Sequence, residues 1–193
     1  MEIHSATGNG NYGAMVGADN RLRVRGVEQS EALDANKEGD AYNINTGLIT
    51  VTNTTEIPLL YFKNNEAKDF IIEAVVLGIY TSANQSASDA MATFIRNPTT
   101  GTIVDNAVDV SINSNRNYGS SNSLTADTYK GAMADTMTDG DDHILVRVTD
   151  DSRNFIAINE VLPKGTSFGL KFTPPTGNTS VVCYAAIIGY IQQ

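Results

Sequence analysis

Two long apolar stretches constrain the fold of this chain more than any other feature. They are Phe70–Tyr80 (FIIEAVVLGIY) and Val181–Ile191 (VVCYAAIIGYI), and nearly every position in them is apolar. Both are shorter than the roughly 20 residues of a membrane helix, and both are rich in the β-branched and aromatic residues that favour strands. Each strand would run about 35 Å. A strand that is apolar on both faces is covered on both faces.

The outer face of a central strand in a two-sheet sandwich normally meets water, so these two stretches predict an additional cover. Long loops, the N-terminal arm or another subunit could supply it. We favour contact between subunits of a symmetric oligomer. Gly78 and Gly189 stand near the end of each stretch, where we expect another group to approach the backbone closely.

The rest of the chain alternates short apolar runs with turn sequences such as NPTTG, DGDD and PPTGNT. This pattern predicts an all-β fold, an antiparallel β-sandwich that is jelly-roll-like, over residues 21–193. Residues 1–20 are rich in Gly and Asn and predict a flexible N-terminal arm. The predicted strands are Leu22–Val27, Leu48–Thr52, Leu59–Lys63, Phe70–Tyr80, Ala92–Arg96, Val108–Ile112, Ile144–Val148, Phe155–Val161, Ser167–Phe172 and Val181–Ile191.

Two segments could each hold a short helix, namely Ala83–Ala92 and Ser123–Ala134. Ser123 can cap the second, but Gly131 would weaken it by about 1 kcal/mol relative to alanine. Neither segment has a sustained apolar stripe, so we expect excursions between strands instead.

Charge excludes several classes of partner. The chain has 13 basic and 22 acidic residues and a net charge of −9, which argues against nucleic acid and anionic membranes as partners. The one basic cluster is RLRVR, with Arg21, Arg23 and Arg25. Its alternation predicts a half-buried strand with one charged face; the alternative is a docking edge for an acidic partner. The N-terminus lacks the charged and apolar regions of a secretory signal.

The segment TDGDDHILVRV raises the question of a metal or catalytic site. Asp139, Asp141 and Asp142 could bind a cation loosely, but the spacing fails the calcium-loop pattern, and an Asp-Gly step is typical of a tight turn. We therefore predict a turn that opens a strand. His143 fits no metal-binding spacing and is expected to be a hydrogen-bonded structural residue.

No other catalytic pattern emerges, and we expect no catalytic, cofactor-binding or metal-binding residues. The single cysteine, Cys183, lies in an apolar stretch and predicts a buried, inert thiol. The chain has no tryptophan, the flat aromatic residue on which sugar-binding sites often depend. A glycosidase remains an alternative, because its pair of carboxylates would leave no spacing signature in the sequence. The loop NSNRNYGSSNS carries Arg116 and Tyr118, which either contact a partner or belong to a solvated connection.

Several long segments resemble virion structural proteins of tailed bacteriophages, especially those of marine and aquatic bacteria. They are LLYFKNNEAKDFIIEAVVLGI, FIRNPTTGTIVDNAVDVSINSNRNYGSSNSLTADTYKGA, TMTDGDDHIL and EVLPKGTSFGLKFTPPTGNTSVVCYAAII. The resemblance covers roughly residues 40–193. It implies a protein that is made in the host cytoplasm and carried in the virion, without enzyme activity.

Within that class, a small sandwich with an arm is similar in build to capsid decoration, or cement, proteins. The similarity implies a homotrimer that binds the major capsid protein on the outside of the head, with an acidic surface facing away from packaged DNA. The alternative is a tail, neck or head-fibre component that recognises a receptor or glycan. A glycan hydrolase carried on the particle is the third possibility.

Overall fold

The structure is a computed structural model that describes residues 15–16, 22–23, 30–52, 55–81, 90–105, 112–148, 153–175 and 180–192. The chain divides into two compact units, Met1–Ser30 and Glu31–Gln193. The expected boundary between arm and sandwich, after residue 20, lies outside the described residues. The smaller unit contains a short antiparallel pair, β1 (Met15–Val16) and β2 (Leu22–Arg23); the rest of the predicted arm lies outside the described residues.

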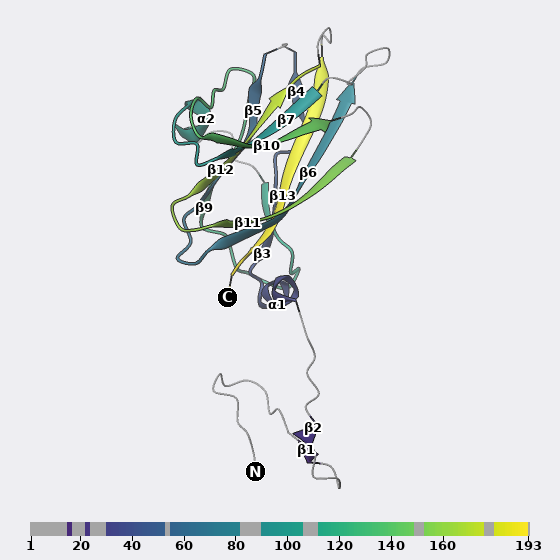
Figure 1. The fold of residues 1–193 in the computed structure, drawn as a ribbon, viewed down its shortest axis with the longest axis vertical. Helices are drawn as coiled ribbons and strands as arrows, with labels where there is room; N and C mark the ends of the chain where they lie inside the picture. Colours follow the sequence, from purple (N-terminus) through teal and green to yellow (C-terminus); the bar gives the residue numbers. More distant parts are fainter. Residues whose placement is uncertain are drawn as a thin grey trace. The chain divides into compact units, whose positions relative to one another are not determined.

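The larger unit is an antiparallel β-sandwich, which confirms the predicted fold class (Figure 1). One sheet has the order β11 (Arg153–Leu162), β6 (Phe70–Thr81), β13 (Val181–Ile191), β3 (Ala41–Asn45) and β8 (Ile112–Asn115), with β4 (Ile49–Val51) also paired to β13. The other has the order β10 (Asp141–Val148), β7 (Ala90–Arg96), β12 (Ser167–Thr173), β5 (Ile57–Asn64) and β9 (Ala126–Lys130).

Eight of these strands pair in nested order along the chain. β3 pairs with β13 and β5 with β12, whereas β6 pairs with β11 and β7 with β10. Successive members of the series fall in opposite sheets in most steps, so the chain crosses repeatedly between the two layers. The two long apolar stretches become β6 and β13, which lie side by side in the middle of the six-stranded sheet.

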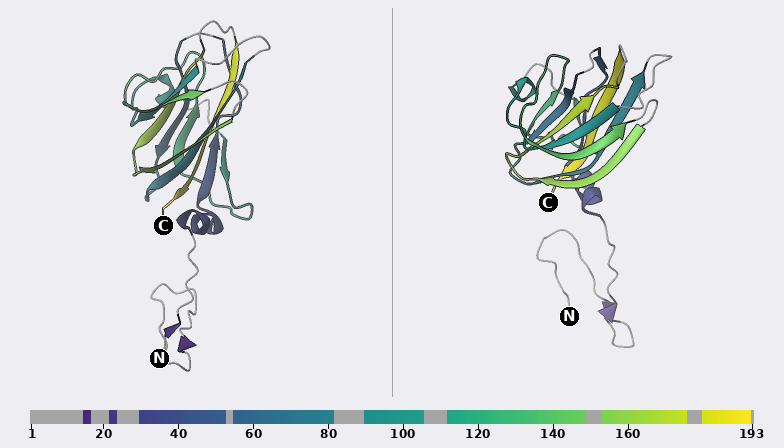
Figure 2. Two further views of the ribbon diagram at one scale, coloured as in Figure 1. Left: turned by 45° about the vertical axis from the view of Figure 1, so that its right-hand side comes forward. Right: turned by 45° about the horizontal axis from the view of Figure 1, so that its top comes forward.

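The core lies between the two sheets, which face each other in the left-hand view of Figure 2. Alternate residues point into it because successive side chains of a strand point to opposite faces. From β6 and β13 these include Val75, Leu77, Cys183, Ala185 and Ile187, all at most 2% exposed. The residues between them point away from the core, so β6 and β13 do present apolar side chains on both faces.

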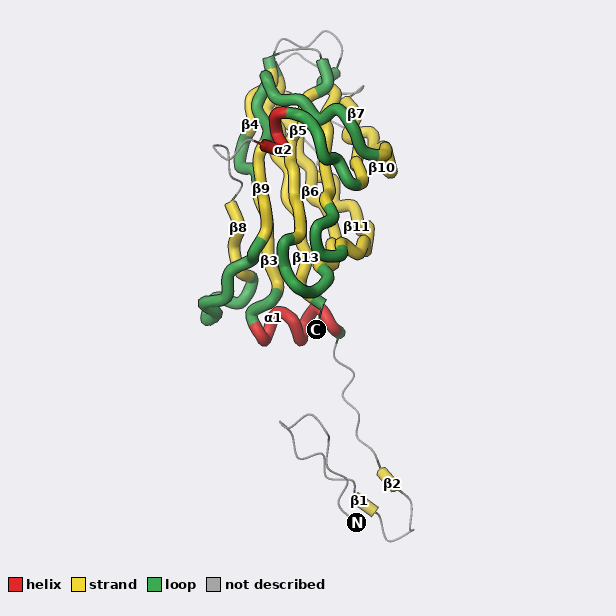
Figure 3. Tube along the Cα trace, turned by 90° about the vertical axis from the view of Figure 1, so that its left-hand side faces the viewer, coloured by secondary structure: helices red, strands yellow, loops and turns green. Residues whose placement is uncertain are grey.

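The two sheets differ in how their outer faces are covered. A short helix, α2 (Thr102–Asp105), and the segment around Met137 pack over the five-stranded sheet (Figure 3). Ile103 and Met137 form a buried cluster there with Tyr61 and Ile95. The cover of this sheet therefore comes from the same chain.

Neither segment that could hold a short helix is helical in its described residues, and the second contains a strand where we expected an excursion. Residues 90–92 of the first segment belong to β7, and residues 82–89 lie outside the described residues. The second segment contains β9, because packing overrides local helix propensity: Tyr129 of β9 stacks on Tyr61, with ring centroids 5.9 Å apart. The helix α1 (Glu31–Glu38) was not predicted. The described chain includes no helix with the length and hydropathy needed to span a bilayer.

Candidate functional site

The side chain of Asp139, in the turn before β10, connects this turn to the loop that contains Thr99 and Thr100. Its Oδ1 accepts hydrogen bonds from the backbone N–H groups of Thr99 and Thr100, each at 2.8 Å, and its Oδ2 accepts one from the Thr99 hydroxyl at 2.5 Å. The hydroxyl of Thr99 and these two N–H groups lower the pKa of Asp139 to about 2. Gly140 follows with φ of +92°. The predicted turn is confirmed, and β10 begins directly after it at Asp141.

The other two aspartates of this segment, Asp141 and Asp142, are exposed at the start of β10. Within the part of the chain that the structure describes, no group of three or more His, Cys, Asp and Glu side chains could hold a metal ion. The oxygens of Asp139 already accept three donors, which a cation would have to replace.

His143 belongs to a polar cluster that joins the edges of the two sheets. His143 Nε2 is hydrogen-bonded to Glu160 Oε1 on β11. Arg96 Nη2 lies 3.3 Å from His143 Nε2 and 3.9 Å from Glu160 Oε1. The predicted hydrogen bonding of His143 is thus confirmed, and its partners are a glutamate and an arginine distant in sequence.

Two β-bulges bring His143 and Glu160 together. β10 has one extra residue, His143, between Asp142 and Ile144, relative to β7. β11 shifts register against β6 just before Glu160, where Asn159 adopts φ of +51°. Bulges commonly redirect a side chain at a sheet edge, and here both redirect polar groups toward the opening between the sheets.

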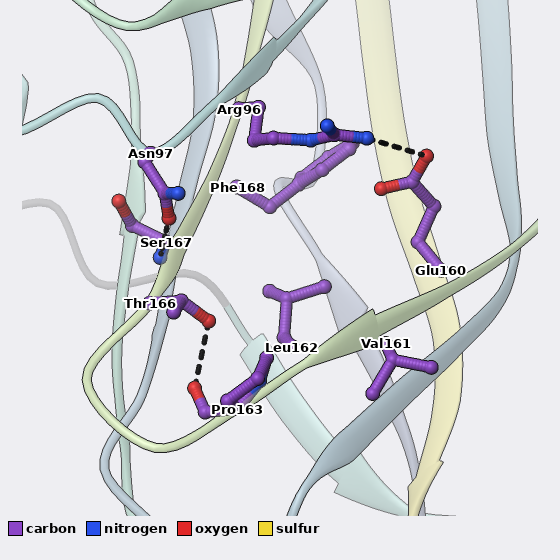
Figure 4. A pocket seen from close by; sticks show the side chains of 9 residues that line it. All are labelled: Arg96, Asn97, Glu160, Val161, Leu162, Pro163, Thr166, Ser167 and Phe168. Atoms are coloured by element: carbon purple, nitrogen blue, oxygen red, sulfur yellow. Dashed lines mark hydrogen bonds and ion pairs between the residues drawn. The ribbon is translucent and has the colours of Figure 1, made fainter.

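The recess beside this cluster is small and its hydroxyl groups already have partners. Figure 4 shows Arg96 and Glu160 pointing toward one another from opposite sides, above Phe168 and Leu162. The recess holds about 80 Å³, whereas pockets for drug-sized ligands hold about 300–1,000 Å³. Ser167 donates its hydroxyl to the Pro98 carbonyl at 2.7 Å, and Thr166 donates to the Pro163 carbonyl at 2.7 Å.

The residues of this recess differ from the side-chain sets of two common kinds of hydrolase. The recess is lined by one carboxylate, that of Glu160, whereas glycoside hydrolysis uses a facing pair. Ser167 does not donate to His143 but to a backbone carbonyl, so these residues do not form a nucleophile–base pair of the serine-hydrolase kind. Two other recesses hold about 160 and 180 Å³. The first is lined by two carboxylates, those of Glu56 and Asp135, and the second by Asp142 and His143.

Cys183 is a buried thiol, as predicted. Its side chain is 1% exposed in the core, and burial raises its pKa to about 12. A thiol in this state is a poor nucleophile because the thiolate is the reactive form.

The end of β8 and the Asn-rich loop that follows it pack against the end of α1. Asn115 Nδ2 donates to the Gly39 carbonyl at 2.5 Å, Asn117 Nδ2 to the Lys37 carbonyl at 2.9 Å, and Asn122 Nδ2 to the Glu38 carbonyl at 3.2 Å. These amides satisfy carbonyls at the helix end, which have no partner within a helix. Sequence reasoning missed this function because the loop and the helix are far apart in the chain.

The two predicted contact residues of this loop have different environments. The Arg116 guanidinium forms an ion pair with Glu73, with Nη1 and Oε2 2.7 Å apart, and its side chain is 30% exposed. Tyr118 is fully exposed, so it is free to meet a partner. Of the basic cluster, Arg21 and Arg25 lie outside the described residues, and Arg23 lies in β2.

Both glycines of the long stretches are sites of close approach, as predicted. A Cβ at Gly78 would lie 2.1 Å from Cε1 of Tyr184, and a Cβ at Gly189 would lie 2.4 Å from the Ile71 carbonyl oxygen. The Tyr184 ring lies across the outer face of the sheet at Gly78 and stacks on Tyr80, with centroids 6.2 Å apart. This outer face is the one for which the sequence predicted an additional cover, with another subunit as the favoured source.

No family model matches the chain, and neither does any curated protein or solved structure.

Proposed function

We propose that the protein is a non-enzymatic structural subunit of a tailed-bacteriophage particle, a decoration protein that binds and stabilises the outside of the head as a homotrimer. The observation that carries this proposal is the outer face of β6 and β13. It is apolar like the core, yet Tyr80 is 50% exposed there, and Phe155 of the neighbouring β11 is 64% exposed. Such a face is typical of a subunit that works in an assembly.

The chemistry of the polar groups supports a structural function. Asp139 caps a turn, Arg116 pairs with Glu73, and His143 pairs with Glu160. Each of these side chains, which could otherwise suggest catalysis or binding, connects parts of the same fold.

The resemblance to virion proteins suggests which protein this chain binds, the major capsid protein. We expect the major capsid protein to contact an exposed part of the sandwich that carries a hot-spot residue type, and Tyr118 is such a residue. An acidic chain with a net charge of −9 suits the outside of a shell, where it does not face packaged DNA.

The experiment is to compare virions with and without this protein. We expect mass spectrometry of purified heads to contain the chain, electron microscopy to place it on the outer head surface, and heads without it to lose their contents at lower temperature. Heads of unchanged composition and thermal stability, or density on the tail alone, would contradict a decoration function.

We also propose that the sandwich is a jelly roll. The nested pairing of β3 with β13, β5 with β12, β6 with β11 and β7 with β10 supports this, because a jelly roll is a two-sheet sandwich of eight strands in two Greek keys.

A further inference from the structure

The outer face of the six-stranded sheet is apolar along β6 and β13 and at Phe155 of β11, and it becomes polar at Asn43 and Asn45 of β3. Strand register places Phe155 of β11 beside Val76 of β6, and Val76 beside Ala186 of β13. The next row places Ala74 beside Ile188. Since Val75, Leu77, Ala185 and Ile187 point into the core, the side chains of these two rows point outward.

Among the described residues, another element covers one end of this face, and farther along Ala74 and Val76 of β6 are buried, at 1% and 3% exposed. Ala35 of α1 packs with Ile71, Ala41 and Tyr190 in a small buried cluster at that end. Farther along, Phe155 and Tyr80 are 64% and 50% exposed, and Tyr184, Ala186 and Ile188 are half-buried. The five-stranded sheet, in contrast, has α2 and Met137 over its outer face.

Charge indicates what can cover the rest. The sequence from Ala74 to Tyr80 and from Val182 to Ile188 contains no charged residue, in a chain of net charge −9. Glu73, at the border of the face, is paired with Arg116. Two acidic copies repel each other over most of their surfaces, but the uncharged segments of β6 and β13 let them approach without burying an unpaired carboxylate. On β11, the charged residue Arg153 pairs in register with Gly78.

The shape and residue types also fit a second copy. Apolar sheet faces pack on other sheets at about 10 Å. Tyr80, Tyr184 and Phe155 are aromatic residues of the kind enriched at interface centres. The uncharged segments are seven residues long in each strand, or about 23 Å at about 3.3 Å per residue. They could form the apolar centre of an interface. A polar rim around this centre would bring the buried area toward the usual value of about 800 Å² per partner.

We propose that copies of this chain pack on one another through the outer face of β11, β6 and β13, with Phe155 and the Tyr80–Tyr184 pair at the centre of the contact. This deepens the proposed function, on which it rests for the expectation that the chain assembles with itself. A two-fold contact would set this face against itself, and a three-fold contact would set it against a different flank of the next copy.

The test is the mass of the full chain in solution, measured by sedimentation over a range of concentrations. We expect the wild-type protein to have two or three times the 20.7 kDa of one chain and to associate more tightly at high salt, because salt screens the repulsion between acidic copies. Phe155→Glu is expected to reduce the mass to one chain. Leu145→Glu, at a position equally exposed (64%) on the edge strand β10, is the matched control and is expected to keep the oligomer.

A second measurement covers the case in which Phe155→Glu does not fold. In a Cys183→Ala background, an environment-sensitive dye is attached to Phe155→Cys or, as control, to Leu145→Cys. We expect the dye at 155 to become shielded as the protein concentration rises, and the dye at 145 to remain in water.

Three results would overturn the inference: a monomeric wild-type chain at all concentrations, a Phe155→Glu variant that keeps its oligomer, or a dye at 155 that is shielded in a monomer. The last would assign the cover to another segment of the same chain. A dimer in solution that Phe155→Glu dissociates would support this contact and contradict the trimer of the proposed function. A trimer in solution, with no copy of the chain in purified virions, would contradict the virion role but not this contact.

Discussion

His143 and Glu160 are hydrogen-bonded to each other although they belong to edge strands of different sheets. Their side chains are 34% and 19% exposed, so the contact lies at the rim of the core and not inside it. Together with Arg96 it connects β7 and β10 of one sheet to β11 of the other. The polar cluster thus holds the two layers together at an edge where no backbone pairing joins them in the described residues.

This relationship predicts a measurable coupling between the two side chains. In a double-mutant cycle of His143→Ala and Glu160→Ala, we expect a coupling of about 1 kcal/mol in the free energy of unfolding, because the pair is partly buried and hydrogen-bonded. The cycle of Arg96→Ala with Glu160→Ala should give about 0.5 kcal/mol or less, since this pair is 3.9 Å apart and Arg96 is 52% exposed. Equal couplings in urea unfolding would argue against a specific His143–Glu160 contact.

Asp139 predicts a dependence of stability on acid pH. Its pKa is lowered to about 2 in the folded protein from an ordinary 3.8, so its contribution is present above about pH 4 and is lost as the pH falls toward 2. The melting temperature of Asp139→Asn should therefore lie below that of the wild type at pH 7, with the gap narrowing between pH 4 and 2. Thr99→Val removes the donor with the largest effect and should give part of the same loss. A gap that does not change with pH would show that the charge of Asp139 is not what matters.

Position 131 requires glycine for a steric reason, which is separate from the low helix propensity of glycine. A Cβ at this position would lie 1.8 Å from the backbone oxygen of Pro58, and the Gly131 N–H donates to the Leu59 carbonyl at 2.9 Å. Gly131→Ala should cost about 2 kcal/mol or more, or about 4–8 °C in melting temperature for a chain of this size. Gly119→Ala, whose Cβ would come no closer than 3.5 Å to Asn117, is the control and should change stability by less than about 0.5 kcal/mol.

The strands with the strongest sequence signal are those that are apolar on both faces. Phe70–Tyr80 and Val181–Ile191 were predicted nearly to the residue, because continuous apolar runs leave few alternatives to a central strand. The turn at Asp139 followed from the Asp-Gly step for a local reason, the φ of +92° at Gly140.

The features that sequence reasoning missed depend on residues distant in the chain. α1 has the sequence EALDANKE, with little apolar content. Its end is held by Asn115, the last residue of β8, and by Asn117 in the loop that follows. The pairing of His143 with Glu160 requires one extra residue in each of two strands. Neither a capping loop from elsewhere in the chain nor a register shift leaves a periodic signal in a single sequence.

Cys183 predicts a thiol that reacts only when the protein unfolds. It is 1% exposed and burial raises its pKa to about 12, so almost no thiolate exists at pH 8 and reagent has no access. A disulfide reagent should modify the native wild-type protein slowly and the urea-unfolded protein at once. Leu145→Cys in a Cys183→Ala background places the thiol at an exposed position and should react immediately in the folded state. Rapid reaction of native Cys183 would mean that β13 opens readily.

The contacts of Asn115 predict that its side-chain NH2 group, and not its side-chain oxygen, stabilises the end of α1. Its Nδ2 donates to the Gly39 carbonyl at 2.5 Å and the Asn122 carbonyl at 3.2 Å, while its Oδ1 accepts from the Asn117 N–H at 2.8 Å. Asn115→Asp keeps the acceptor but sets a carboxylate oxygen against two carbonyls. We expect a loss of about 1–3 kcal/mol in the free energy of unfolding, measured by urea denaturation.

The matched control for this substitution is Asn45→Asp. Asn45 Oδ1 accepts from the Gly47 N–H at 2.8 Å, the same two-residue turn that Asn115 makes with Asn117. An aspartate preserves this bond, so the control should lie within about 0.5 kcal/mol of the wild type. Hydrogen exchange of the α1 amides should then rise in Asn115→Asp and stay unchanged in Asn45→Asp. If both variants lose stability equally, the turn and not the contact with α1 is what Asn115 supports.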